Sequence, residues 1–169
     1  MKKITILVSL VALFAISSLT VNAQVSAVAE TSANIVGPIS ISKSIDLSFG
    51  NVAVSPTIAG TVVLDPASAR TQTGGVTLPV ITGTVSAAKF TVAGESGTTY
   101  AITLPASVVL TNGGNTMTVN NFTSTPTATG SLASGTEDIF VGGTLNVAAA
   151  QVSGLYTNAS DLVVTVNYN

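Results

Sequence analysis

The last strand-length stretch of the chain, residues 162–168, reads LVVTVNY and carries an apolar side chain at every second position. Successive side chains of an extended strand point to opposite faces, so this period predicts a half-buried β-strand. The residues on its apolar face are Leu162, Val164, Val166 and Tyr168. The same period recurs toward the N-terminus, at 45–49, 90–92, 100–104, 117–119 and 139–141. The pattern indicates an all-β chain.

Glycine-rich stretches separate these segments, at 74–75, 94–97, 112–115 and 142–143. Glycine adopts the positive φ angles of tight turns, so we interpret each stretch as a connection between antiparallel strands. The arrangement predicts a single antiparallel β-sandwich.

Two segments depart from the pattern. Residues 122–135 are rich in Ser and Thr, which predicts a surface loop, and the Ala-rich residues 146–151 predict one helical turn.

The charge content excludes several classes of protein. Only 7% of the residues are charged, against about 25% in an ordinary soluble domain. Five Lys and Arg residues in the whole chain cannot form a basic face for phosphates, so we predict no nucleic-acid partner. The apolar fraction of 46% is too high for a disordered chain, which could not bury a core.

The N-terminus predicts export. Two lysines precede the apolar run 4–16, and residues 21–23 read VNA, a small-residue cleavage site. We therefore interpret 1–23 as a signal peptide, followed by a short segment 24–34 and a β-sandwich domain 35–169. The run 4–16 is shorter than the roughly 20 residues of a membrane-spanning helix, and no later run is longer. We expect no membrane span in the mature chain, and a location in the periplasm, at the cell surface or outside the cell.

Two side chains that often act in catalysis are missing from the chain. The chain contains no His and no Cys, which removes the commonest general base and all thiolate chemistry. Residues 40–43 match the S-x-x-K pattern of penicillin-recognising enzymes, but in a strand Ser40 and Lys43 face opposite sides. The adjacent acids Glu137 and Asp138 are interpreted as a solvated turn. We predict no catalytic residues, no metal site, no cofactor and no enzymatic activity.

Residues 24–34 alternate weakly between small apolar and polar side chains. The apolar positions share one parity: Val25, Ala27, Ala29 and Ala33. A strand of this kind could pair with an open sheet edge of another molecule. The alternative is a frayed N-terminus with no partner.

A family resemblance rests on several motifs spread over most of the chain. They lie at 47–50 (LSFG), 60–66 (GTVVLDP), 88–94 (AKFTVAG), 141–145 (VGGTL), 154–156 (GLY) and 164–169 (VTVNYN). Together they resemble the secreted bacterial domain of unknown function numbered 4402. That family is similar to spore coat protein U and to pilins of archaic chaperone–usher systems.

The resemblance implies an immunoglobulin-like, pilin-like sandwich that lacks its last strand. It also implies a periplasmic chaperone and an outer-membrane usher as partners, together with other copies of the chain. By the same resemblance the chaperone would contact the terminal strand through its alternating positions. These are Leu162, Val164, Val166 and Tyr168.

The sequence leaves two functions from different classes open. The first is an exported, non-enzymatic structural protein of the cell surface, a fimbrial (pilin-like) or adhesion and matrix subunit that assembles by β-strand pairing. The alternative is a monomeric secreted binding module for a glycan or a host protein. An exported hydrolase is a poor third hypothesis because the chain has no His.

Overall fold

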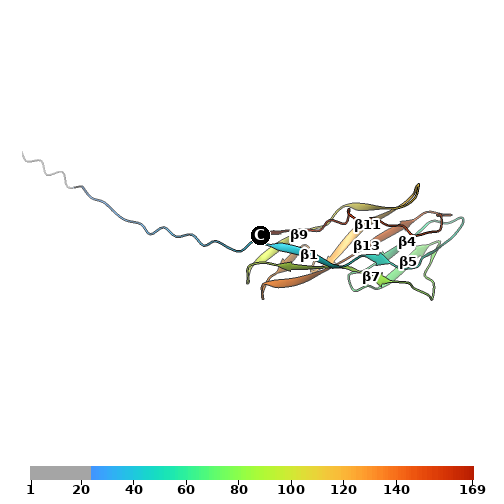
Figure 1. The fold of residues 1–169 in the computed structure, drawn as a ribbon, viewed down its shortest axis with the longest axis horizontal. Coiled ribbons are helices and arrows are strands. Elements are labelled where there is room, and N and C mark those ends of the chain that lie inside the picture. Colours follow the sequence, from blue (N-terminus) through green and yellow to red (C-terminus); the bar gives the residue numbers. More distant parts are fainter. Residues whose placement is uncertain (1–23) are drawn as a thin grey trace, which may run out of the picture. The chain divides into compact units, whose positions relative to one another are not determined.

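Residues 24–169 are described by a computed structural model, in which they form fourteen β-strands and no helix (Figure 1). The strands are β1 (Ser40–Ile45), β2 (Ser48–Phe49), β3 (Ala53–Val54), β4 (Gly60–Leu64), β5 (Arg70–Gly74), β6 (Val76–Thr77), β7 (Val85–Ser86), β8 (Ala88–Ala93), β9 (Thr99–Thr103), β10 (Ser107–Asn112), β11 (Asn115–Thr125), β12 (Thr129–Ser131), β13 (Thr136–Val147) and β14 (Thr165–Tyr168). All pairings are antiparallel, which confirms the predicted all-β antiparallel class.

The largest sheet has seven strands and is built around β13. Its main path runs β1-β8-β13-β11-β10, and β4 joins β13 further along, followed by β5. The first half of β13 pairs with β8 and its second half with β4, while β11 lies along the other edge. A three-stranded sheet, β12-β9-β14, and the ribbons β2-β7 and β3-β6 complete the strand pairing.

The glycine pair 142–143 lies inside β13 and not in a turn, so that prediction was wrong. It marks the place where β13 changes partner from β8 to β4. A Cβ on Gly142 would lie 2.2 Å from the carbonyl oxygen of Leu64, and a Cβ on Gly143 would lie 2.9 Å from the ring of Phe122. The glycines therefore permit close approach of neighbouring backbone and aromatic atoms.

Two clusters of buried side chains form the core. The first lies between the large and the three-stranded sheet and contains Ala88, Phe90, Val92, Tyr100, Leu132, Ile139, Val141, Val164 and Val166. The second contains Phe49, Val62, Leu64, Val76, Val119, Leu145 and Val147. We call the part of residues 36–169 around the first cluster the β9 end and the part around the second the β4 end (Figure 1).

Two local predictions were wrong. Residues 122–135 are not one surface loop, because β11 continues to Thr125 and β12 follows. The Ser- and Thr-rich composition is compatible with strands, and Leu132 in this stretch is fully buried. Residues 146–151 contain no helical turn. They complete β13 and then turn at Ala149 and Ala150.

Residues 36–169 form one compact unit. Residues 24–35 contain no strand, and all their side chains are exposed. The predicted signal peptide, 1–23, lies outside the described residues. Within 24–169, a membrane-crossing helix is absent.

Candidate functional site

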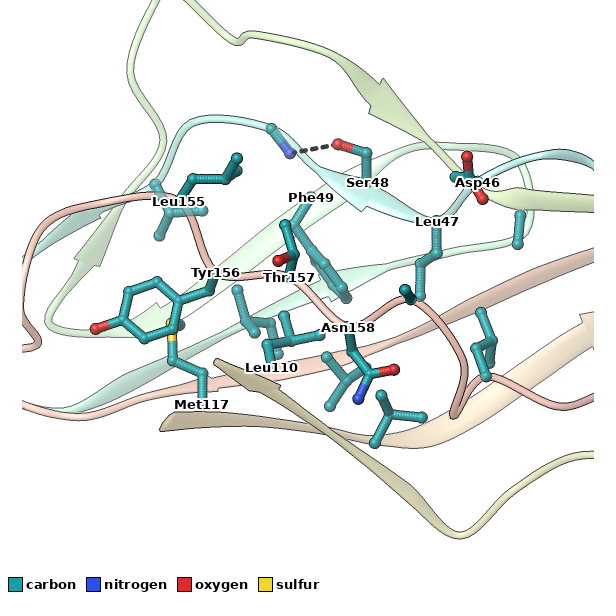
Figure 2. A pocket seen from close by; sticks show the side chains of 18 of the residues that line it. Asp46, Leu47, Ser48, Phe49, Leu110, Met117, Leu155, Tyr156, Thr157 and Asn158 are labelled. Carbon is teal, nitrogen blue, oxygen red and sulfur yellow. Dashed lines mark hydrogen bonds between the residues drawn. The ribbon is translucent and has the colours of Figure 1, made fainter. Parts of the chain in front are cut away.

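A groove with a largely apolar lining lies in the 36–169 unit. Its volume is about 1110 Å³. Residues 46–54, including β2 and β3, form one wall, which we call wall one. Residues 151–162, which precede β14, form the opposite wall, wall two. Figure 2 shows Leu110 and Met117 of the large sheet in the floor between the two walls.

The floor is the inner face of the large sheet. Its apolar side chains come from β10, β11 and β13: Val108, Leu110, Met117, Val119, Phe122 and Leu145. Val119 is buried by its neighbours, whereas Leu110 and Met117 are only half-buried. The three-stranded sheet covers the first cluster but does not extend over this part of the large sheet. Phe49 of β2 packs in the same cluster as Val119 and Leu145, whereas Leu110 and Met117 of the floor stay half-buried.

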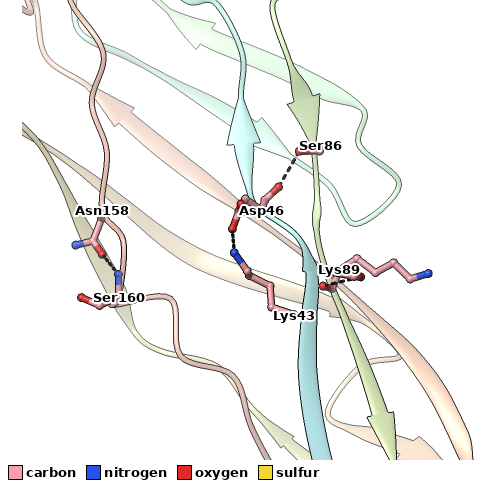
Figure 3. Close-up of polar contacts among 7 residues, drawn as sticks. Lys43, Asp46, Ser86, Lys89, Asn158 and Ser160 are labelled. Carbon is pink, nitrogen blue, oxygen red and sulfur yellow. Dashed lines mark hydrogen bonds and ion pairs between the residues drawn. The ribbon is translucent and has the colours of Figure 1, made fainter.

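Wall one is held from the side that faces away from the groove. Its strands β2 and β3 pair with β7 and β6. The Arg70 side chain donates to the carbonyl oxygens of Phe49 (2.6 Å) and Asn51 (3.0 Å). The Ser86 hydroxyl donates to the carbonyl of Asp46 at 2.7 Å (Figure 3).

Wall two is tied to β10. The amide and carbonyl of Thr157 each bond to those of Thr111 at 3.0 Å. The side-chain amide of Asn158 donates to the carbonyl of Val109 at 2.8 Å, and its oxygen accepts from the amide of Ser160 at 3.0 Å (Figure 3). No hydrogen bond joins 46–54 to 151–162 in the part of the chain that the structure describes.

Outside the groove, hydrogen bonds tie segments together at both ends of the unit. At the β9 end, the Tyr168 hydroxyl donates to the carbonyl of Gly37 (3.0 Å) and accepts from the amide of Glu95 (2.7 Å). Tyr168 therefore holds the start of β1 beside the end of β14. At the β4 end, the amide of Ala150 donates to the carbonyl of Ser55 at 2.9 Å.

The groove is nearly neutral. Lys43 and Asp46 are the charged residues among those that line it, and they form an ion pair with each other (Figure 3). Among the described residues, no group of three or more Asp, Glu, His or Cys side chains could hold a metal ion. An uncharged, largely apolar occupant fits this lining best.

Two other polar contacts lie outside the groove. Burial, together with its hydrogen bond to Glu137, raises the pKa of Tyr100 far above its usual value. Hydrogen bonds from Lys89 and Thr91 lower the pKa of Asp138. Both acids lie in β13, so the predicted solvated turn at Glu137 and Asp138 was wrong. Ser40 and Lys43 lie in β1, and the Ser40 hydroxyl bonds to the carbonyl of Ala93.

The residues predicted to mediate assembly fall into two groups. Val25, Ala27, Ala29 and Ala33 are exposed and lie outside any strand. In the terminal stretch, Val164 and Val166 are buried in the first cluster, Leu162 lines the groove, and Tyr168 packs beside the first cluster. The exposed residues Val163, Thr165 and Asn167 alternate with them, which confirms the register predicted for 162–168.

The groove was not predicted from the sequence. In wall one, the alternation at 45–49 was predicted, and Leu47 and Phe49 do face inward; beyond Gly50 no period continues, because β3 has only two residues. Wall two carried a usable signal. Tyr156 and Asn158 have the same parity as Leu162 and the inward side chains of β14, and both are half-buried.

Comparison with known proteins gives a family. Neither the comparison with curated proteins nor that with solved structures found a match. The family described as "domain of unknown function (DUF4402)" matches residues 39–168, a range that includes every strand and both walls of the groove. Because the match covers most of the chain, the protein belongs to this DUF4402 family.

Proposed function

We propose that this protein is an exported, non-enzymatic structural subunit of the cell surface that assembles by β-strand addition. Residues 24–34 of one copy occupy the groove of a second copy. The observation that supports this proposal is the groove itself, whose floor leaves Leu110 and Met117 half-buried and whose walls are bonded to β7 and β10. A strand in this position gains main-chain hydrogen bonds and buries alternate side chains on the floor.

The length of residues 24–34 is compatible with the groove. Eleven extended residues span about 36 Å, since a strand rises about 3.3 Å per residue. The longest strand of the unit, β13, has 12 residues and runs from the β9 end to the β4 end. A strand formed by 24–34 could therefore follow the groove along its length.

The chemistry of the segment also suits the groove. Its odd positions are Val25, Ala27, Ala29, Thr31 and Ala33, none of them charged. Its single charged residue, Glu30, has the opposite parity and would face solvent. Residues 24–34 have no strand pairing of their own, so adding them to a groove breaks no existing ladder.

The same proposal extends to the finer fold and to further partners. In it, residues 36–169 are an immunoglobulin-like sandwich with one strand missing, related to spore coat protein U and to archaic chaperone–usher pilins. A periplasmic chaperone covers the groove before assembly, and an outer-membrane usher delivers the subunit. The incomplete cover of the second cluster supports this interpretation, because exposed core surface needs protection during export.

Light scattering coupled to size-exclusion chromatography tests the proposal on four proteins. These are the chain 24–169, its deletion to 35–169, the double variant Ala27→Asp with Ala29→Asp, and the control Ser26→Asp. We expect oligomers that resist mild denaturant for 24–169 and for Ser26→Asp. We expect monomers for the deletion and the double variant, because a charge on the inward parity cannot be buried in the apolar groove.

Monomers for all four proteins would overturn the assembly proposal and favour the monomeric binding module for a glycan or host protein. In a separate outcome, residues 24–34 occupy the groove of their own chain. This arrangement would give monomers at every concentration, but the double variant would then unfold at a lower temperature than Ser26→Asp.

A further inference from the structure

The two walls of the groove differ in how well their main chains could receive a strand. Wall one is not a regular edge. Gly50 has a φ of 66°, which breaks the extended conformation between β2 and β3. The carbonyls of Phe49 and Asn51 already accept from Arg70, and the amide of Asn51 donates to the carbonyl of Thr82 at 2.6 Å. These three main-chain groups at the centre of wall one are thus already bonded.

Wall two is extended where it passes β10. Thr157 directs both its amide and its carbonyl toward Thr111. In an extended chain the main-chain groups of the neighbouring residues point to the opposite side. Those neighbours are Tyr156 and Asn158, and their amides and carbonyls have no hydrogen-bond partner in the described part of the chain. These groups face the side of wall two that is away from β10.

Burial shows the same alternation. The side chains of Tyr156 and Asn158 are half-buried, whereas those of Leu155, Thr157 and Ala159 are exposed. Residues 155–158 thus form an extended segment with a single β-bridge, from Thr157 to Thr111, and the chain bends at Ala159; in the described part of the chain this segment is paired on one edge only. An isolated strand with unpaired main-chain groups is a template for a further strand.

Side chains fix this segment in place. The Tyr156 hydroxyl donates to the carbonyl of Val152 and accepts from the Gln151 side chain, both at 2.8 Å. The Asn158 side chain donates to Val109 of β10 and accepts from the amide of Asp161 at 2.8 Å. The free edge is therefore held in an extended conformation before any partner arrives, which lowers the entropy cost of pairing.

We propose that the incoming strand pairs with the main-chain groups of Tyr156 and Asn158, and not with wall one. Residues 155–158 then become an internal strand between β10 and the strand of the second copy. This inference rests on the proposed function and specifies which edge receives the strand. In this arrangement the inward side chains of the incoming strand lie beside Tyr156, and its outward side chains lie beside Thr157.

Residue-resolved amide hydrogen exchange tests this edge. The protein is the chain 24–169 with the substitutions Ala27→Asp and Ala29→Asp. These substitutions prevent its own residues 24–34 from occupying a groove. The probe is a synthetic peptide of residues 24–35. On addition of the peptide we expect the amides of Tyr156 and Asn158 to exchange at least tenfold more slowly. The amide of Thr157, already bonded to β10, and that of Val52 in wall one serve as internal references.

The outcomes separate the two proposals. Peptide binding with slower exchange at Tyr156 and Asn158 alone supports the edge. Binding with slower exchange at Val52 and none at Tyr156 or Asn158 overturns the edge but retains the proposed function. Failure of the peptide to bind overturns both.

Disulfide trapping gives a second measurement, since the chain has no native Cys. A cysteine at Thr157 should cross-link between copies to at least one cysteine at Ser26, Glu30 or Ser32, which lie on the outward parity. A cysteine at Ala53, exposed on wall one, is the matched control. Cross-linking through Ala53→Cys and not through Thr157→Cys would overturn the proposed edge.

Discussion

The β9 end and the β4 end of the protein differ in how their cores are covered. At the β9 end, the large sheet and the three-stranded sheet enclose the first cluster, and Tyr100, Leu132 and Ile139 are fully buried. At the β4 end, the large sheet faces two-residue ribbons and the irregular wall two, and Leu110 and Met117 remain half-buried. The two ends share β13, yet only one has a second sheet opposite it.

This difference indicates a division of roles within one fold. At the β9 end, the apolar side chains of the first cluster are buried within the isolated chain, without a partner. The β4 end retains apolar surface whose burial contributes stability only when something fills the groove. Substitutions in the first cluster should therefore lower the free energy of unfolding of the isolated chain, whereas substitutions at the half-buried Leu110 and Met117 should mainly affect assembly.

The largest expected effect is that of Val164→Asp, which tests whether the β9 end is a closed core. Val164 is only 8% exposed, so the substitution would bury an unpaired carboxylate. We expect a loss of about 3–5 kcal/mol in the free energy of unfolding. The neighbouring Thr165 is exposed, and Thr165→Asp should change it by less than about 0.5 kcal/mol. Urea unfolding measures both, and equal effects would contradict the burial register of 162–168.

The second prediction compares one aliphatic residue from each end. Ile139→Ala leaves a cavity in the first cluster and should cost about 2–5 kcal/mol. Leu110→Ala, in the half-buried floor of the groove, should cost the monomer less than half as much, because water already reaches that side chain. The same substitution should weaken assembly, measured as a higher dissociation constant for the peptide 24–35. A larger loss of monomer stability for Leu110→Ala would show that the β4 end is closed.

A third comparison uses two tyrosine hydroxyls. Tyr168→Phe removes the hydrogen bonds of β14 to Gly37, before β1, and to Glu95, between β8 and β9, and should lower the free energy of unfolding by about 1–2 kcal/mol. Tyr156→Phe removes the bonds to Val152 and Gln151 in wall two. Because those partners lie in exposed loop residues that water can reach, we expect about 0.5 kcal/mol or less. Thermal unfolding measures both, and the reverse order would contradict the comparison of the two ends.

The β9 end could largely be predicted from the sequence. Alternation at Phe90 and Val92 in β8, and at Ile139 and Val141 in β13, gives both the strands and their buried faces. These strands are long enough for a two-residue period to appear, and each faces a core on one side only. The inward face of the terminal stretch 162–168 was predicted correctly for the same reason.

The groove could not be predicted in the same way. Gly142 and Gly143 suggested a turn because local sequence cannot show that β4 and Phe122 approach the backbone there. Residues 122–135 suggested a loop because Ser and Thr are common in both loops and strands. In wall two the parity of Tyr156 and Asn158 was a local signal for the inward face, but the pairing of Thr157 with Thr111 is a long-range contact that no local pattern shows. An uncovered face is a property of the whole fold, and periodicity reports only which side chains face inward.

The smallest expected effect concerns Asp138, a surface carboxylate of β13 at the β9 end. Its side chain is 40% exposed and accepts from Lys89 and Thr91, which lowers its pKa below the usual value of about 3.9. A carboxyl group whose pKa is lower in the folded state contributes stability above its unfolded pKa, and this contribution disappears as the pH falls through its folded pKa. Asp138→Asn should therefore lower the melting temperature slightly at pH 7 and hardly at all at pH 2. Added salt should reduce the difference at pH 7, because exposed ion pairs are screened. Thermal unfolding of both proteins at the two pH values measures the effect, and a difference that is the same at pH 7 and pH 2 would show that the substitution acts through packing or hydrogen bonding and not through charge.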